Sequence, residues 1–578
     1  MDNSAIAKVF RDIADLLELK GGNPFKIRAY QRAARTIEGL PTELEQLRRE
    51  GRLREVPGIG ESIAQKVESL LSTGRLELYD ELRAEFPAGI LTLMDIPGVG
   101  PKTALRLAEE LGVSNADELE KAILEGRVAG VFRLGEKTAE NILRHIQAMR
   151  RKERRIPLGR ALPIVEQVLQ TLKEESETYA LVPAGSLRRF KETVGDIDIM
   201  GTAPDPIKVL RTFVQLPQVR EVLLQGSTKA SVILGDNLQA DLRIVERDAF
   251  GSLLQYFTGS KDHNIILRER AVRQGLKLSE YGITDLRTGK MQKFATEEAY
   301  YERLGLEFIP PELREGRNEI ELAEKNNLPH LLELSDIRGD LHVHTDWSDG
   351  HDSLLDMALA AKAHGYEYLA ITDHSSGRGI AHGLNEERLR AQIAEIRRVN
   401  QNLEGIEILA GIEVDIRADG SLDLPDSVLA ELDIVIAAVH SAMGQSREKM
   451  TQRIIKAMRN PRVNVLAHPT CRLLGEREPI EVDMEEIFQT AKRTGVALEI
   501  NAMPDRLDLK DLHVFRAREL GCKLVIGTDA HRVGHLDLMR FGVGVARRGW
   551  CEAKDILNTR SLPELKTALK RSEVATNL

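Results

Sequence analysis

The chain has 578 residues, of which 42% are hydrophobic and 30% charged, and this composition indicates a globular protein of roughly four domains. Its formal net charge of −9 excludes a uniformly basic nucleic-acid binder, and the lack of an apolar run of about 18 residues excludes a membrane span. Three widely spaced cysteines and the absence of an export signal predict a protein of the reducing cytoplasm, which we expect to be a monomer.

The first 155 residues show helical periodicity interrupted by turns rich in proline and glycine. Apolar residues recur at helical spacing over Ile6–Leu19 and Ala29–Ile37. Three turns each precede a predicted helix: Val56–Gly60 before Glu61–Leu71, Ile96–Gly100 before Pro101–Leu111, and a looser copy, Phe132–Gly135, before Glu136–Met149. The repetition predicts a series of short helices joined by tight turns.

The glycines of the first two turns are Gly58, Gly60, Gly98 and Gly100. They permit a tight turn and leave the first N–H groups of the next helix exposed, and these groups can bind a DNA phosphate. The pattern resembles the helix-hairpin-helix motif, which contacts the DNA backbone and not the base sequence. An ordinary pair of antiparallel helices is the alternative for a single copy, and the second copy favours nucleic-acid binding.

The stretch Asn23–Tyr30 and the first hairpin together resemble the small lyase domain of DNA polymerases of the beta type. The resemblance implies that Lys66 is the lysine that forms a Schiff base with a sugar aldehyde, and that Lys26 lies near it. A lysine amine can attack an aldehyde when neighbouring cations or burial lower its pKa.

Two aspartates, Asp196 and Asp198, alternate with isoleucines in a segment that predicts a strand over Asp196–Gly201. The strand period places both carboxylates on one face, where they repel each other unless a cation lies between them. A third carboxylate, Asp241, stands in the predicted strand Gln239–Val245. Three carboxylates on neighbouring strands predict a site for two Mg²⁺ or Mn²⁺ ions, as phosphoryl transfer uses. A solvated strand edge is the alternative for the first pair alone.

The surrounding segments complete an α/β pattern, with a predicted helix and three further strands: Ala161–Leu172, Thr178–Pro183, Val219–Gln225 and Ala230–Leu234. With its Gly-Ser and Asp-x-Asp pairs, Gly185–Met200 resembles the nucleotidyltransferase palm of family X DNA polymerases. The resemblance implies catalytic metal ligands at the three aspartates. It also implies triphosphate contacts at Gly185, Ser186 and Arg189, and DNA contacts at Lys229 and Arg243.

The next informative stretch is Tyr256-Phe-Thr-Gly-Ser260. In the same family, Tyr256, Phe257 and Gly259 border the incoming nucleotide. Asn264 reaches the base edge and Arg268 the template strand. A buried aromatic pair in a helical thumb is the structural alternative. The double proline after Phe308 and the charged run that follows it predict a linker.

Apolar runs recur after residue 338 at intervals of about 30 residues, with charged amphipathic stretches between them, which predicts a barrel of βα units. The predicted strands are Asp340–His344, Tyr368–Thr372, Ile408–Val414, Ile434–Val439, Val463–Ala467, Val496–Ile500 and Leu524–Gly527. Eleven of the 14 histidines lie after His330, which predicts a metal-rich domain.

Residues of types that commonly bind metals stand at or near the ends of most of these runs: His342, His344, Asp349, His374, Glu413, His440, His468, Asp529 and His531. Strand ends of a barrel share one rim, so we expect two or three Zn²⁺ or Mn²⁺ ions there. The motifs around these residues, such as His-Val-His-Thr and Gly-Thr-Asp-Ala-His, resemble those of the PHP family (polymerase and histidinol phosphatase). The resemblance implies that these nine residues occupy all nine metal-binding positions of the family.

The predicted organisation is a lyase-like domain (1–80), fingers with a second hairpin (81–155), a palm with a mixed sheet (156–245) and a helical thumb (246–317). A linker (318–337) and a distorted (β/α)7-type PHP barrel (338–578) follow. The resemblance implies a DNA polymerase that fills short gaps in repair, bound to gapped or primed DNA and dNTPs, with a 3′–5′ exonuclease. A 3′-phosphatase or abasic-site endonuclease activity stays open. The alternatives are a small-molecule phosphoesterase with an inert DNA-binding front half, and a repair scaffold without catalysis.

Overall fold

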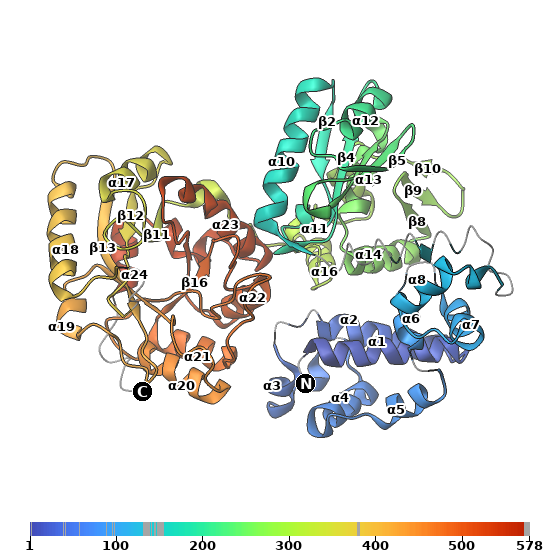
Figure 1. Ribbon diagram of the computed structural model, residues 1–578, viewed down its shortest axis with the longest axis horizontal. Coiled ribbons are helices and arrows are strands. Elements are labelled where there is room, and N and C mark those ends of the chain that lie inside the picture. Colours follow the sequence, from blue (N-terminus) through green and yellow to red (C-terminus); the bar gives the residue numbers. More distant parts are fainter. Residues whose placement is uncertain are drawn as a thin grey trace.

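The computed structural model describes residues 1–570 except positions 2, 39, 41, 57, 88, 95, 97–98, 131–138, 140–141, 144–145, 147–154 and 378–381. It contains a helical amino-terminal region, an α/β palm, a thumb and a barrel. In Figure 1 the barrel lies at the left, the palm at the upper right and the amino-terminal helices at the lower right. No helix among the described residues is both long and apolar enough to span a membrane.

The amino-terminal region consists of short helices around one hydrophobic core. They are α1 (Asn3–Leu19), α2 (Pro24–Glu38), α3 (Leu44–Arg49), α4 (Glu61–Thr73), α5 (Glu77–Ala84), α6 (Ile90–Met94), α7 (Pro101–Leu111) and α8 (Ala116–Leu124). The core runs continuously from Ile6 to Ile146, so the segments before and after residue 80 pack against each other. The third hairpin, Phe132–Gly135, and most of its predicted helix, Glu136–Met149, fall outside the described residues.

The palm is a five-stranded sheet in the order β2-β4-β7-β6-β5. Its strands are β2 (Ala180–Pro183), β4 (Ile197–Thr202), β5 (Glu221–Gln225), β6 (Lys229–Ile233) and β7 (Gln239–Ile244), and a small pair, β1 (Ile156–Pro157) and β3 (Thr193–Val194), lies beside it. Strands β4 and β7 are parallel and the other pairs antiparallel, which makes the sheet mixed as predicted.

The alternation of residues along β4 and β7 decides which face of the sheet is buried. Ile197, Ile199 and Leu242 point to the main core, where helices α10 (Leu158–Glu175) and α12 (Pro206–Val214) pack. The opposite face carries the aspartates. The short helix α11 (Gly185–Arg188) follows β2.

The thumb is helical, as predicted, and it also contains a small antiparallel sheet. Its helices are α13 (Phe250–Thr258), α14 (Lys261–Arg273) and α15 (Glu297–Arg303), and its strands are β8 (Leu276–Ser279), β9 (Gly282–Asp285) and β10 (Met291–Gln292). Helix α16 (Glu319–Glu324) lies in the predicted linker, yet its first residue is buried because Glu319 Oε1 lies 2.7 Å from His263 Nδ1 of the thumb.

The carboxy-terminal region is a parallel seven-stranded sheet in sequential order that closes almost completely into a barrel. Its strands are β11 (Gly339–Val343), β12 (Tyr368–Ile371), β13 (Glu407–Asp415), β14 (Ile434–Ala438), β15 (Val465–Leu466), β16 (Ala497–Asn501) and β17 (Leu524–Gly527). The first and last strands meet where His344 N donates to the Ala530 carbonyl at 2.8 Å.

The barrel helices surround this sheet: α17 (Leu354–Ala363), α18 (Glu386–Asn400), α19 (Asp426–Leu429), α20 (Arg447–Met458), α21 (Met484–Thr494), α22 (Asp511–Leu520), α23 (Met539–Arg548) and α24 (Leu562–Leu569). Helix α23 faces the palm, and Figure 1 shows it between the barrel and α10. A Cβ at Gly544 would lie 2.1 Å from Phe190 Cε1, so only glycine leaves room for this palm side chain.

Candidate active sites

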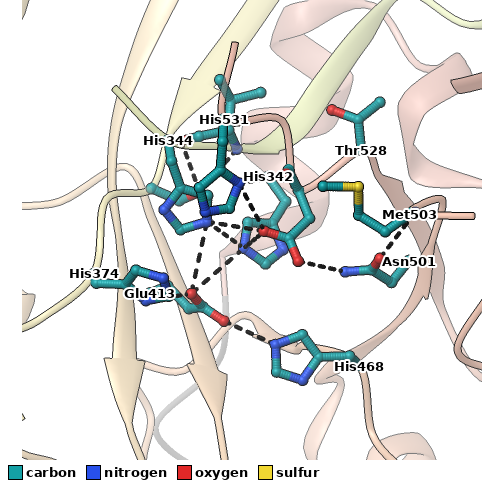
Figure 2. Close-up of polar contacts among 12 residues, drawn as sticks. His342, His344, His374, Glu413, His468, Asn501, Met503, Thr528 and His531 are labelled. Carbon is teal, nitrogen blue, oxygen red and sulfur yellow. Dashed lines mark hydrogen bonds and ion pairs between the residues drawn. The ribbon is translucent and has the colours of Figure 1, made fainter. Parts of the chain in front are cut away.

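All nine predicted metal-binding residues of the barrel meet at one rim. They come from the carboxyl ends of β11, β12, β13, β14, β15 and β17, because parallel strands end at the same edge. His342 and His344 point the same way by strand period, and their Nε2 atoms lie 3.2 Å apart. Figure 2 shows His342, His344, His374, His468 and His531 gathered around Glu413.

The ligand atoms form three overlapping groups in which every atom lies within 4.8 Å of the others. These groups are His344, Asp349, His374 and His531; His342, His344 and Asp529; and His374, Glu413 and His440. Within them His344 Nε2 lies 3.1 Å from Asp529 Oδ1, and His374 Nδ1 lies 2.7 Å from Glu413 Oε2. His468 Nε2 lies 3.0 Å from Glu413 Oε1, so Glu413 stands between several imidazoles.

Two carboxylates behind the rim orient the histidines, and the sequence prediction did not include them. Glu499 of β16 lies 2.6 Å from His342 Nδ1 and also accepts the His468 backbone N–H at 2.7 Å. Asp415 lies 2.5 Å from His440 Nδ1. Such partners fix the ring orientation of a metal-binding histidine. The only sequence signal for Asp415 is its place two residues after Glu413, on the same face of the strand.

The charges of the site depend on one another. Burial alone would lower the pKa of His342, but the carboxylates of Glu499, Asp529 and Glu413 raise it well above its usual value. Burial and the neighbouring imidazoles of His374 and His531 lower the pKa of His344 to about 3. Burial would raise the pKa of Glu413, but the surrounding imidazoles hold it well below its usual range.

The donor set fits Zn²⁺ or Mn²⁺. Imidazole nitrogens and carboxylate oxygens are the ligands these ions take, and nine exceed what one ion needs. The buried Nδ1 atoms of His344 and His468 have no hydrogen-bond partner among the described residues. Buried polar atoms are rarely left without partners, so this observation also favours bound cations.

A pocket of about 130 Å³ opens onto the rim, and residues that follow β16 form part of its wall. Among them is Arg506, whose Nε lies 3.7 Å from Asp529 Oδ2. Burial would lower its pKa, but Asp529 and Glu413 raise it, so the guanidinium remains charged. A guanidinium beside metal-binding carboxylates is suited to contact a phosphate oxygen. Sequence reasoning missed Arg506.

In the palm, Asp198 and Asp241 stand opposite each other on the parallel strands β4 and β7. Asp196 precedes β4, and the strand period places it on the same face. A Cβ at Gly185 would lie 3.0 Å from Asp198 Oδ2, and Gly185 has a positive φ of 60°. Among the described residues, every group of potential metal ligands whose atoms lie within 4.8 Å of one another is in the barrel. The three palm carboxylates therefore lie farther apart than the members of these groups do.

Arg189 connects the segment of Gly185 and Ser186 with the segment Tyr256–Gly259. Its Nε donates to Glu315 Oε1 at 3.1 Å and its Nη1 to the Thr258 carbonyl. A Cβ at Gly259 would lie 3.3 Å from Arg189 Nη1. Ser186 follows Gly185 in α11. Two of the predicted nucleotide-contacting segments therefore lie side by side.

The aromatic pair Tyr256 and Phe257 meets edge to face, with ring centroids 5.3 Å apart. The guanidinium carbon of Arg243 lies 4.5 Å from the Phe257 centroid, and Lys229 Nζ lies 3.8 Å from Asp241 Oδ2. The sheet face that carries the aspartates therefore also carries the two DNA contacts predicted for the palm.

The predicted base contact and template contact are linked on α14. Asn264 Nδ2 donates to the Tyr256 carbonyl at 2.8 Å, and Arg268 Nε donates to the Asn264 carbonyl at 3.0 Å. The structure thus groups the predicted nucleotide residues on the palm and the adjoining thumb helices.

The predicted phosphate-binding turns lie in the amino-terminal region. Gly60 and Gly100 precede α4 and α7 with nearly the same backbone angles, φ −77° and ψ 174° against φ −76° and ψ 170°. The turn at Gly58 has φ 89°, which favours glycine. Gly98 falls outside the described residues. The two hairpins therefore present their following helices in the same way.

Comparisons with known proteins match the chain in separate parts and as a whole. Family models match residues 1–76 (helix-hairpin-helix domain), 90–148 (SAM-like helix-hairpin-helix tandem), 253–315 (DNA polymerase beta thumb) and 340–503 (PHP domain). The DNA polymerase/3′-5′ exonuclease PolX of Bacillus subtilis (strain 168) is 40% identical over 575 residues, which cover 99% of this chain and 100% of that protein.

Two further relatives match parts of the chain. A probable phosphatase of Thermoanaerobacter sp. (strain X514) is 33% identical over 206 residues, covering 33% of this chain and 78% of the phosphatase. DNA polymerase lambda of Arabidopsis thaliana is 25% identical over 346 residues, covering 54% of this chain and 62% of that polymerase.

Proposed function

This chain belongs to the bacterial DNA polymerase/3′-5′ exonucleases of the PolX type, the family X polymerases with a carboxy-terminal PHP domain, and we propose that it fills short gaps during DNA repair. Its substrates are gapped or primed DNA and dNTPs, and it acts as a monomer in the cytoplasm. The observation that carries the proposal is the pairing of Asp198 with Asp241 beside the Gly185 turn, in one chain with a barrel rim that gathers groups of potential metal ligands.

In the polymerase reaction, Asp196, Asp198 and Asp241 would hold two Mg²⁺ or Mn²⁺ ions, which would neutralise charge on the triphosphate and favour deprotonation of the primer hydroxyl. Asp241 helps to accept the proton of the primer 3′-OH. The N–H groups of Gly185 and Ser186, with Arg189, bind the triphosphate. Tyr256 and Phe257 border the sugar of the incoming nucleotide. These roles use the residues that β4, β7, α11 and α13 bring to one face.

In the barrel, the nine predicted ligands would hold two or three Zn²⁺ or Mn²⁺ ions, which would supply activation of water for phosphodiester hydrolysis. Arg506 binds a non-bridging oxygen of the scissile phosphate, since its guanidinium stays charged and faces the pocket. The resulting 3′–5′ exonuclease removes terminal nucleotides. A 3′-phosphatase or abasic-site endonuclease activity would use the same groups, because each reaction cleaves a phosphate ester.

The rival function is a small-molecule phosphoesterase with a non-catalytic DNA-binding front half. The similarity of 206 residues to a probable phosphatase favours this rival for that third of the chain alone. The match to a DNA polymerase beta thumb and the aligned palm aspartates favour the polymerase, because a binding module needs neither.

Primer extension on DNA with a one-nucleotide gap tests the polymerase with Asp241→Asn. This change keeps the side-chain size and removes a metal-binding charge, so we expect extension to fall by about 100-fold or more. The control is Asp248→Asn, which alters an exposed aspartate paired with Lys293 and should leave extension unchanged. Wild-type protein that does not extend a primer, or an Asp241→Asn variant that extends normally, would refute the proposal.

A further inference from the structure

One carboxylate of the palm reaches a buried arginine of the barrel. Glu192 precedes β3, and its Oε2 lies 2.7 Å from Nη2 of Arg472. The Arg472 side chain is only 7% exposed, whereas that of Glu192 is 37% exposed. Glu192 is therefore the accessible half of an ion pair that crosses the interface between polymerase and nuclease domains.

Arg472 also binds the segment Met503–Leu507, so it connects Glu192 with that segment. Its Nε donates to the Arg506 carbonyl at 2.9 Å, and its Nη2 donates to the Leu507 carbonyl. The same segment meets the palm a second time, because a Cβ at Gly159 of α10 would lie 2.1 Å from Pro504 Cβ. The palm therefore contacts the segment through a charged pair and through close packing.

The segment also forms one wall of the metal pocket. Met503, Asp505 and Arg506 line it, and Arg506 is the arginine among the lining residues. Figure 2 shows Met503 beside Asn501, where the Met503 N–H donates to Asn501 Oδ1 at 3.0 Å. Asn501 Nδ2 in turn donates to Asp529 Oδ2 at 3.1 Å. A shift of this segment would therefore move Arg506 relative to the ligands.

We propose that Glu192 of the polymerase palm is a positioning residue for the nuclease, acting through Arg472 on the segment that presents Arg506 to the scissile phosphate. The proposal rests on the exonuclease function proposed above. Without Glu192, the guanidinium of Arg472 loses its carboxylate partner across the interface. Its two bonds to the carbonyls of the segment are then less well oriented. Loss of an outer-shell partner of a metal ligand typically costs 10- to 100-fold in activity, and misplacement of a positioning group by about 1 Å can cost about 100-fold.

The test compares Glu192→Ala with Glu166→Ala in the full chain, by 3′ nuclease kinetics on single-stranded and gapped DNA. Glu166 forms the matched control because it also pairs across this interface, at 2.7 Å, but with Arg540 of α23, which lies outside the pocket segment. We expect Glu192→Ala to lower kcat by about 10-fold with a smaller change in KM. Glu192→Gln, which keeps an acceptor of equal size, should recover part of the loss. Glu166→Ala should match the wild type.

A double-mutant cycle with Arg506→Gln separates positioning from a general loosening of the interface. If Glu192 acts through Arg506, Glu192→Ala should add no further loss in the Arg506→Gln background. Additive losses, an unchanged Glu192→Ala variant, or an equal loss in Glu166→Ala would overturn the inference while leaving the nuclease function intact. A wild-type chain without 3′ nuclease activity would overturn both. Primer extension and thermal unfolding of each variant report whether the fold is preserved.

Discussion

Lys66 shows how local surroundings prepare a single side chain for chemistry. Its Nζ lies 2.8 Å from Ser62 Oγ and 3.0 Å from the Ser62 carbonyl, and 6.0 Å from the centroid of the Tyr30 ring. Burial, and then repulsion by Lys26, lowers the pKa of Lys66 below the usual lysine value. We propose that this lysine gives the chain a deoxyribose-phosphate lyase activity, because a neutral amine is the form that attacks an aldehyde.

Borohydride trapping on an oligonucleotide with a 5′ abasic sugar phosphate tests this role. A lowered pKa means that the neutral amine is lost only when the pH falls below that value. Trapping by Lys66 should therefore rise with pH and reach its plateau at a lower pH than an ordinary lysine would. Lys66→Ala should abolish the adduct, and Lys121→Ala, which alters an exposed lysine of α8, should not. An equal yield of adduct in Lys66→Ala would remove the assignment.

Individual residues also show what the sequence can and cannot predict. The gathering of the nine predicted metal-binding residues at one rim was predictable, because most of them stand at or just after a strand end and strand ends share a rim. Glu499, Asp415 and Arg506 were not, because their roles depend on which side chain they meet across the barrel. The pair of Glu192 with Arg472 depends on how two domains pack, and no local pattern in the sequence records that packing.

At the scale of elements, the strands and helices predicted within the described residues are present and differ mainly at their ends. Helix Pro101–Leu111 and strand Leu524–Gly527 coincide with their predicted bounds, because proline or glycine marks their limits. The small thumb sheet escaped prediction, since its strands have at most four residues and pair only with one another. Apolar periodicity is too weak a signal in segments of that length.

The turn between β2 and α11 yields a prediction at this scale. Gly185→Ala forces a positive φ on alanine and places a Cβ 3.0 Å from Asp198 Oδ2, so the carboxylate must move. We expect kcat/KM for nucleotide incorporation to fall by about 10-fold or more, since small displacements of positioning groups are costly.

The 3′ nuclease activity of the same variant should not change. The matched control is Gly235→Ala, also in the palm, where a Cβ meets no atom within 4 Å. Normal incorporation by Gly185→Ala would mean that this turn does not approach the reacting phosphates.

At the scale of the whole molecule, ion pairs connect the barrel with the palm and thumb. Arg548 of α23 donates to Glu315 at 2.9 Å and to Asp511 at 2.6 Å, and Arg189 pairs with the same Glu315. Buried charges are tolerated only when they are paired and hydrogen-bonded, as these are. The arrangement connects the domains, while the palm aspartates and the histidine-rich cluster of the barrel stay on separate sheets.

The claim that one chain holds two separate metal-dependent centres for DNA phosphates is tested most directly with His344→Ala. Primer extension and 3′ nucleotide release are measured on one labelled gapped DNA, with and without dNTPs. The control is His364→Ala, a barrel histidine paired with Asp537 away from the pocket. We predict that His344→Ala loses nucleotide release and retains extension, whereas the control retains both. Undiminished 3′ release by highly purified His344→Ala protein, or loss of extension in a folded variant, would contradict the account.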